Sequence, residues 1–138
     1  MTGSSRRRRA KRRIARGRAL ERTYIHLSDT ADATPIPVDR DFWARIGERT
    51  QLHSGRLVTA FDLAGETHWE MHPAGDEILY AVSGIMEAVL ERKRGTGASR
   101  FKAGEFFIVP RGAWHTVRAV RPGKLLAITP GEGTEVRN

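Results

Sequence analysis

Residues 70–84 read EMHPAGDEILYAVSG, and residues 104–115 read GEFFIVPRGAWH. Each stretch combines a turn rich in proline and glycine with a short apolar run. Pro73–Asp76 forms the first turn, directly before Glu77, and Pro110–Gly112 forms the second, shortly before His115. Short apolar runs separated by such turns are typical of a β-sandwich or a β-barrel.

The same alternation of apolar runs and turns continues on both sides of these stretches. It predicts strands over residues 56–63, 67–72, 77–83, 85–92, 101–109 (broken at Ala103 and Gly104), 114–120 and 124–129, the last of these being the final strand. Before residue 55 the pattern is weaker, and it indicates an edge strand over Tyr24–Leu27 and a short helix over Asp39–Ile46. The predicted fold class is therefore all-β.

Three ionisable side chains share one face of the strand predicted at residues 67–72. Side chains two positions apart along a strand point the same way, so His68, Glu70 and His72 face together. Buried ionisable groups are costly unless they are paired or bind a metal. The turn at residues 73–76 can fold Glu77 back beside His72, and His115 follows the second turn. We therefore expect His72, Glu77 and His115 to face one pocket inside the barrel.

The two quoted stretches resemble the paired motifs of the cupin family. Residues 70–84 are similar to the first motif, G-x5-H-x-H-x3,4-E-x6-G, with His72 at the second histidine, Glu77 at the glutamate and Gly84 at the closing glycine. Residues 104–115 are similar to the second motif, G-x5-P-x-G-x2-H-x3-N, at every fixed position up to His115. The motifs lie about 20 residues apart, as in compact single-domain cupins, and the resemblance covers roughly residues 55–130.

The resemblance implies a double-stranded β-helix, the jelly roll of the cupin barrel, with one divalent metal bound inside it. His72, Glu77 and His115 are then metal ligands. Glu70 stands in place of the first histidine of the pattern and Ala119 in place of the final asparagine. The first glycine is displaced, with Ala64 at its place and Gly65 next to it. Family members commonly pair their N-terminal strands, so the resemblance also implies a homodimer, with Tyr24–Leu27 and the Phe42-Trp43 segment as interface.

The replacement by Glu70 leaves three interpretations open. As a fourth ligand, Glu70 gives a set of two imidazoles and two carboxylates, which suits Fe(II) or Mn(II) and tolerates Zn(II) or Ni(II). His68 could take the missing place instead, but it lies about 7 Å further along the strand, so we expect it to line the pocket or to lie behind the ligands. Tyr80, an aromatic residue, is assigned to packing or the pocket wall and not to catalysis. Alternatively the metal is lost, and the polar cluster serves an organic ligand.

Two functions of different class follow from this pocket. The first is a small metal-dependent enzyme, such as a dioxygenase or an isomerase, in which Glu70 is either a ligand or the catalytic base. The second is a non-catalytic, regulatory barrel that binds a small molecule and contacts nucleic acid or a partner protein through a basic tail.

The net charge of +8 is concentrated at the start of the chain. Residues 1–22 hold ten Arg or Lys against one Glu, whereas residues 23–138 hold fourteen bases against fifteen acids. Such a block of like charges is expected to be disordered alone, and any contact with nucleic acid is expected only through this tail. A solvated extension, an over-long gene start and an organelle transit peptide are the alternatives. We divide the chain into a basic tail (1–22), an N-terminal arm (23–54) and the barrel (55–132).

The chain contains no cysteine. This excludes disulfides, thiolate zinc sites and cysteine nucleophiles, and it favours a cytoplasmic protein. No apolar run approaches the roughly 20 residues of a membrane-spanning helix, so no membrane contact through such a helix is expected.

Overall fold

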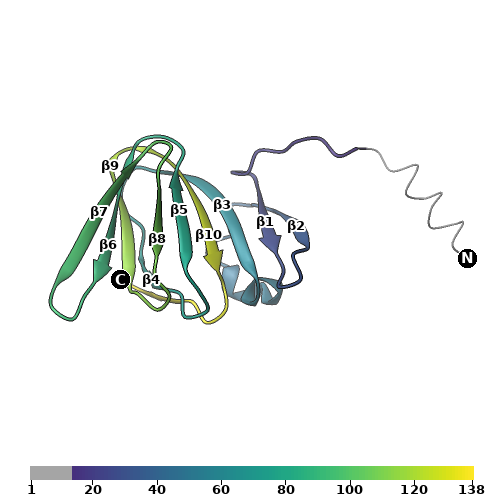
Figure 1. Cartoon of the computed structure of the whole chain (residues 1–138). Helices are drawn as coiled ribbons and strands as arrows, with labels where there is room; N and C mark the ends of the chain where they lie inside the picture. Colours follow the sequence, from purple (N-terminus) through teal and green to yellow (C-terminus); the bar gives the residue numbers. More distant parts are fainter. Residues whose placement is uncertain (1–13) are drawn as a thin grey trace, which may run out of the picture.

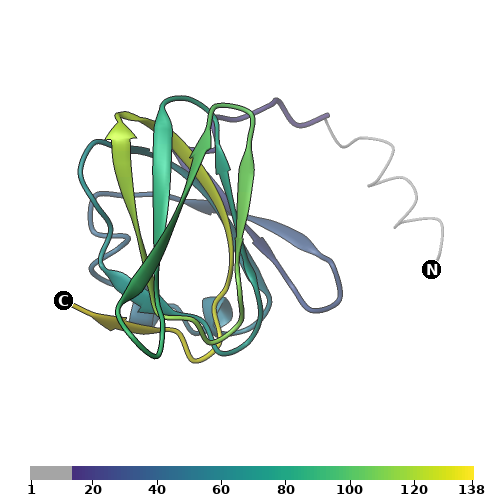
Figure 2. The same cartoon turned by 60° about the vertical axis from the view of Figure 1, so that its left-hand side comes forward.

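The computed structural model describes residues 14–138; residues 1–13 of the basic tail lie outside the described part. Two antiparallel sheets face each other, as the two views in Figure 1 and Figure 2 show. One sheet has the order β2 (Ala33–Pro37), β1 (Thr23–Leu27), β3 (Arg56–Leu63), β10 (Gly123–Pro130), β5 (Glu77–Ala81), β8 (Phe106–Val109). The other has the order β11 (Glu135–Arg137), β4 (Trp69–Met71), β9 (His115–Arg121), β6 (Ile85–Glu91), β7 (Thr96–Lys102). The predicted all-β jelly roll is confirmed.

The main core lies between the two sheets, and strand periodicity decides which residues enter it. In β5, Glu77, Leu79 and Ala81 are buried whereas Ile78 and Tyr80 are exposed, because successive side chains point to opposite faces. The core cluster takes buried residues from both sheets: Leu63, Leu79, Ala81, Met86, Ala88, Phe101, Val109, Val117, Leu125 and Ala127. The interior therefore holds Glu77 at one end of an otherwise apolar row.

The N-terminal arm adds two strands to the first sheet. β1 pairs with β3 on one side and with β2 on the other, so the prediction that Tyr24–Leu27 is an edge strand was wrong; β2 is the edge. Tyr24 and Phe42 are buried in a second core cluster, with their rings edge to face at 5.1 Å. Since both rings pack within their own chain, the expected homodimer interface there stays a prediction resting on Trp43, which is 50% exposed.

The helix predicted over Asp39–Ile46 is absent from the described residues. Turns occupy this segment, and two 3-10 helices, η1 (Ile46–Glu48) and η2 (Thr50–His53), follow. The Asp39 carboxylate accepts a hydrogen bond from the Asp41 backbone N–H, which closes a turn. Phe42 is the one buried residue between Asp39 and Ile46, so a helix here would lack the apolar stripe that stabilises short helices by packing.

The chain does not end its sheet at residue 129 as predicted. β11 follows and pairs with β4, with Val136 opposite Glu70 and Arg137 opposite Trp69. β11 also lies beyond residue 132, where the sequence placed the end of the barrel. Its three residues are all exposed and show no apolar alternation, so only the backbone ladder reveals the strand.

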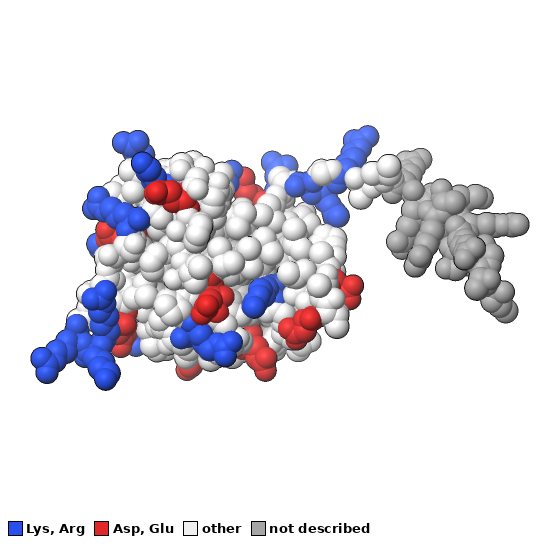
Figure 3. Space-filling model, viewed as in Figure 1, with Lys and Arg blue, Asp and Glu red and all other residues white. Residues whose placement is uncertain are grey.

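The outer face of β5 and β8 is apolar. Ile78 pairs with Ile108 and Tyr80 with Phe106, and all four side chains are at least one third exposed. Figure 3 shows an uncharged area over β8, β5 and β10, with charged side chains around its margin. Tyr80 therefore belongs to the outer surface of the barrel.

In the described part of the chain, no helix is long and apolar enough to cross a membrane.

Candidate metal centre

Three strands bring four ionisable side chains together. Glu70 lies in β4 and pairs with His115, the first residue of β9. His72 follows β4 directly and lies on the same face as Glu70, two positions along. Glu77 opens β5 after the turn at residues 73–76. One ligand-type atom from each of the four lies within 4.8 Å of the others.

Glu77 is at the centre of this cluster. Its Oε1 lies 3.0 Å from Nε2 of His115, and its Oε2 lies 3.3 Å from Nε2 of His72. Glu70 approaches from the other side, with its Oε2 3.5 Å from Nε2 of His72. The side chains of Glu77 and both histidines are at most 5% exposed, whereas that of Glu70 is 35% exposed. The cluster is therefore buried on three sides and open on the side of Glu70.

Each imidazole uses its Nδ1 for a hydrogen bond that points away from the cluster. Nδ1 of His115 donates to the Ala113 carbonyl at 3.0 Å, because a carbonyl only accepts. Nδ1 of His72 lies 2.9 Å from the Thr134 hydroxyl, which lies 3.3 Å from the Pro130 carbonyl. The hydroxyl satisfies that carbonyl by donating to it, and it then accepts from Nδ1 of His72. Both rings therefore carry a proton on Nδ1, and in their neutral form each turns a lone pair on Nε2 towards Glu77.

A carboxylate only accepts, so each Nε2 needs a proton or a metal ion between itself and Glu77. At His115 the 3.0 Å contact with Oε1 of Glu77 is a hydrogen bond that a proton on Nε2 supplies. Nε2 of His72 is buried and has no hydrogen-bond partner among residues 14–138. Oε2 of Glu77 accepts a hydrogen bond from the Thr129 hydroxyl at 2.5 Å, which orients the carboxylate from behind. Acceptors that converge on one point need a cation between them, and imidazoles fixed by their second nitrogen are typical of metal ligands. The residues present thus fit a divalent metal.

Without a metal, the negative charge of Glu77 is balanced through its contacts with the two imidazoles. Burial raises the pKa of Glu77, but the imidazoles of His115 and His72 outweigh it and bring this pKa down to about 2. Burial lowers the pKa of His115, yet the neighbouring Glu77 carboxylate raises it overall. In the metal-free protein, the Glu77 carboxylate therefore favours a proton on Nε2 of His115, in the hydrogen bond between them.

Glu70 responds differently to the same surroundings. Burial raises its pKa, and the charge of Glu77 raises it further, while nearby histidines, His68 among them, partly offset the rise. A carboxylate held beside a second carboxylate tends to take up a proton unless a metal cation balances the two charges. Glu70 is thus a second carboxylate for which a metal would be the partner.

The two residues expected around the ligands lie in different places. His68 is exposed, precedes β4 and is close enough to Glu70 to influence its pKa, so it lies at the rim of the cluster. Tyr80 lies on the opposite face of β5 from Glu77 and is 37% exposed. The assignment of Tyr80 to the pocket wall was wrong, because it is an odd number of residues from the inward-facing Glu77.

The sequence did not single out the groups that hold the ligands from behind. Thr129 and Thr134 supply hydroxyls, and residue 113 supplies a backbone carbonyl, which any residue type carries. Thr134 lies 62 residues from His72, so no local pattern links them. Thr129 faces inward on β10 opposite the start of β5, which becomes visible only once the strand order is known.

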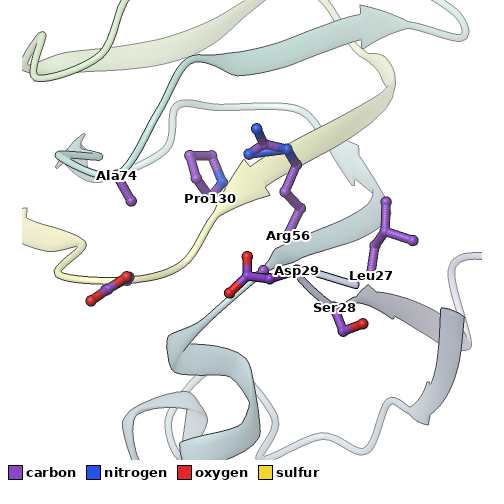
Figure 4. A pocket seen from close by; sticks show the side chains of 8 residues that line it. Leu27, Ser28, Asp29, Arg56, Ala74 and Pro130 are labelled. Atoms are coloured by element: carbon purple, nitrogen blue, oxygen red, sulfur yellow. The ribbon is translucent and has the colours of Figure 1, made fainter. Parts of the chain in front are cut away.

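A separate cavity of about 260 Å³ opens near the end of β10, and Figure 4 shows its wall. Its lining residues are Leu27, Ser28, Asp29, Gly55, Arg56, Ala74, Pro130 and Glu132. None of the four clustered ionisable residues lines it. The cavity lies between the arm and the barrel, and it is separate from the four clustered ionisable side chains.

Comparison with solved structures finds partial matches. A cupin-2 domain protein from Shewanella frigidimarina NCIMB 400 aligns at 23% identity and a TM-score of 0.48, covering 54% of this chain and 70% of that one. A protein from Neisseria meningitidis aligns at 28% identity and a TM-score of 0.47, covering 55% and 74%. Peruvianin-I, a cysteine peptidase from Thevetia peruviana latex, aligns at 17% identity and a TM-score of 0.50, covering 61% and 56%. This last likeness concerns the fold alone, and the present chain has no cysteine.

Sequence comparison assigns the family directly. No curated protein sequence matches the chain. The family model described as the cupin domain matches residues 57–129, which is more than half of the chain and includes all four clustered residues. With the jelly-roll topology and both motifs in place, the chain belongs to the cupin family.

Proposed function

We propose that this cupin binds one divalent metal through Glu70, His72, Glu77 and His115, and that it is a metal-dependent enzyme acting on a small molecule. The observation that carries the proposal is the buried Nε2 of His72, which has no hydrogen-bond partner in the described part of the chain. It lies 3.3 Å from the Glu77 carboxylate, which Nε2 of His115 also approaches. A site built for an organic ligand alone would be expected to pair these acceptors with donors of its own.

The donor set favours a particular group of metals. Two imidazoles and two carboxylates suit Fe(II) or Mn(II), and Zn(II) or Ni(II) would also bind. Carboxylate oxygens are hard ligands, and the absence of thiolates removes the preference for softer metals. We propose Fe(II) or Mn(II) as the native ion, with selection depending on metal supply as well as on affinity.

The protein side of the mechanism follows from burial. A bound metal supplies a Lewis acid that activates water or O₂ or polarises a substrate carbonyl. His72, Glu77 and His115 form the buried floor, and Thr129 keeps the Glu77 carboxylate turned towards the two imidazoles. Glu70 stands at the open side, so we place substrate entry there, with His68 at the rim available to contact an oxygen-bearing substrate.

Metal analysis tests this proposal. Purified protein is stripped with chelator, reloaded with Mn(II) or Fe(II), dialysed and measured by elemental analysis. The expected result is about one ion per chain for the unmodified protein. His72→Ala and His115→Ala each remove an imidazole, and they are expected to weaken binding by more than the roughly 10- to 100-fold that loss of an outer hydrogen bond costs.

His53→Ala is the matched control, since His53 is exposed and lies outside the cluster. It should bind metal as the unmodified protein does. Circular dichroism of each variant shows whether the fold is kept. A folded chain that binds no divalent metal, or a full ion in both His72→Ala and His115→Ala, would contradict the proposal. Thermal-shift screening of the loaded protein with small acids and sugars, followed by turnover assays, then separates an enzyme from a non-catalytic binding module.

A further inference from the structure

The last residues of the chain lie beside the cluster of four ionisable side chains. We call residues 131–137 the C-terminal clasp; they follow β10 and include β11. The clasp lies outside residues 57–129, which the family model matches, so the family assignment says nothing about it. In Figure 1 the C-terminus lies beside β4, the strand that carries Glu70.

The clasp contacts two of the four clustered residues. The Thr134 hydroxyl lies 2.9 Å from Nδ1 of His72, on the side of the ring away from the cluster. Two residues later, Val136 pairs with Glu70 across the β11–β4 ladder. The same short segment therefore contacts one ligand through a side chain and holds the backbone of another.

Two glycines allow the clasp to take this path. A Cβ on Gly131 would lie 2.2 Å from the Leu52 carbonyl oxygen, so only glycine permits the close approach to η2. Gly133 has a φ of +70°, a conformation that residues with side chains adopt rarely, and a Cβ there would lie 3.0 Å from Cγ of Pro73. The turn is closed by a hydrogen bond from the Thr134 N–H to the Gly131 carbonyl. The backbone thus presents the Thr134 hydroxyl at a fixed place.

Arg137 fastens the far end of the clasp to the barrel. Its guanidinium lies over the ring of Trp114, 4.3 Å from the centroid, and over that of Trp69 at 5.5 Å. It also forms an ion pair with Glu91 of β6. The negative face of an indole ring attracts a guanidinium placed over it, so these contacts hold Arg137 in place. Both ends of the clasp are therefore anchored on residues that are not metal ligands.

We propose that the clasp is a positioning element of the metal site and that Thr134 is its working residue. By accepting a hydrogen bond from the Nδ1–H of His72, Thr134 holds the tautomer whose Nε2 lone pair points at Glu77 and Glu70. This inference rests on the proposed metal function for its consequence, although the tautomer itself belongs to the metal-free protein as well. Thr134 acts through His72 and touches neither metal nor substrate.

The test replaces the hydroxyl without changing the volume. Thr134→Val removes the acceptor, Thr134→Ser keeps it, and Thr96→Val makes the same exchange at an exposed threonine of β7. The first readout is Mn(II) affinity by chelator competition. The second is the His72 tautomer in the metal-free protein, from two-bond nitrogen–proton correlation spectra of the imidazole.

Thr134→Val should bind Mn(II) about 10- to 100-fold more weakly, as is typical for loss of a hydrogen bond behind a ligand. Its His72 should become a mixture of tautomers, whereas Thr134→Ser and Thr96→Val should match the unmodified protein in both readouts. Unchanged affinity and an unchanged tautomer in Thr134→Val would overturn the inference. If the unmodified protein binds no Mn(II), the proposed function fails, and the tautomer comparison alone decides whether Thr134 orients His72.

Discussion

Glu70 differs from its three neighbours because it combines a place in the cluster with access to solvent. Its side chain is 35% exposed, while those of His72, Glu77 and His115 are at most 5% exposed. A buried ligand that is removed leaves a cavity and an unbalanced charge, whereas water can replace an exposed one. At the residue scale, this divides the four into three buried residues, for which we propose metal binding, and one exposed residue at which the proposed site would meet its substrate.

Glu70→Ala should therefore keep most of its bound metal and change what surrounds it. Two imidazoles and Glu77 remain, so the Mn(II) content should stay near that of the unmodified protein, while water gains access to the position that Glu70 leaves. The longitudinal relaxation rate of water protons in a solution of the Mn(II) protein should rise, and turnover of any substrate found by screening should be lost.

Glu66→Ala is the matched control for Glu70→Ala, because Glu66 is an exposed carboxylate outside the cluster. It should leave both readouts unchanged. Normal turnover in Glu70→Ala would show that this carboxylate is neither an essential ligand nor the catalytic base.

At the scale of elements, the two strands of the arm extend one of the two sheets, and a second core packs beside the main one. Residues 33–37 and 23–27 extend the sheet beyond β3, and the cluster of Tyr24, Ile36, Phe42, Leu52 and Leu57 fills the space beneath them. Phe42 is fully buried and meets the rings of Tyr24 and Trp43 edge to face. The arm is therefore held by one aromatic anchor, and no regular α-helix is needed for it.

Phe42→Ala should cost about 3–5 kcal/mol of unfolding free energy, the usual range for removing a buried phenylalanine. Trp43→Ala is the control: Trp43 is adjacent but 50% exposed, so its loss should cost about half as much or less. Urea denaturation with a common m-value measures both. Equal losses would mean that burial of Phe42 is not what anchors the arm. Metal affinity should not change in either variant, since neither ring contacts the cluster.

At the scale of the whole molecule, the positive charge is concentrated in the basic tail. The bases of the tail account for the excess positive charge, and residues 23–138 are close to neutral. In Figure 3 the described surface shows acidic and basic side chains interspersed around an uncharged face. We therefore expect a polyanion to be attracted to the basic tail and not to the barrel.

Removing residues 1–18 deletes nine bases and changes the net charge from +8 to −1. The full chain should bind a short DNA duplex at low salt, with an affinity that falls about 10³- to 10⁵-fold between 50 and 200 mM salt if six or more phosphates are contacted. The shortened chain should show no such binding, while its thermal stability and metal content stay the same. Fluorescence anisotropy measures the binding, and equal DNA affinity of the two chains would place the contact elsewhere.

The sequence by itself determined the barrel and most of its chemistry. Turns with proline and glycine and period-two alternation are local, so they predicted β3, β5, β6, β9 and β10 within a few residues. The spacing of Glu70 and His72 along one strand face, and the turn before Glu77, are local as well. The cluster of four could be anticipated for this reason.

Only the tertiary structure decided what stands behind and around that cluster. β2 and β11 have no apolar pattern of their own and exist through ladders to β1 and β4. Thr134 and the Ala113 carbonyl set the tautomers of the two imidazoles through contacts that no spacing rule encodes. Tyr80 was assigned to the pocket wall, yet the pleat of β5 turns it outward. Local patterns fix which face a residue occupies, whereas hydrogen bonds between distant segments depend on how the strands are ordered in space.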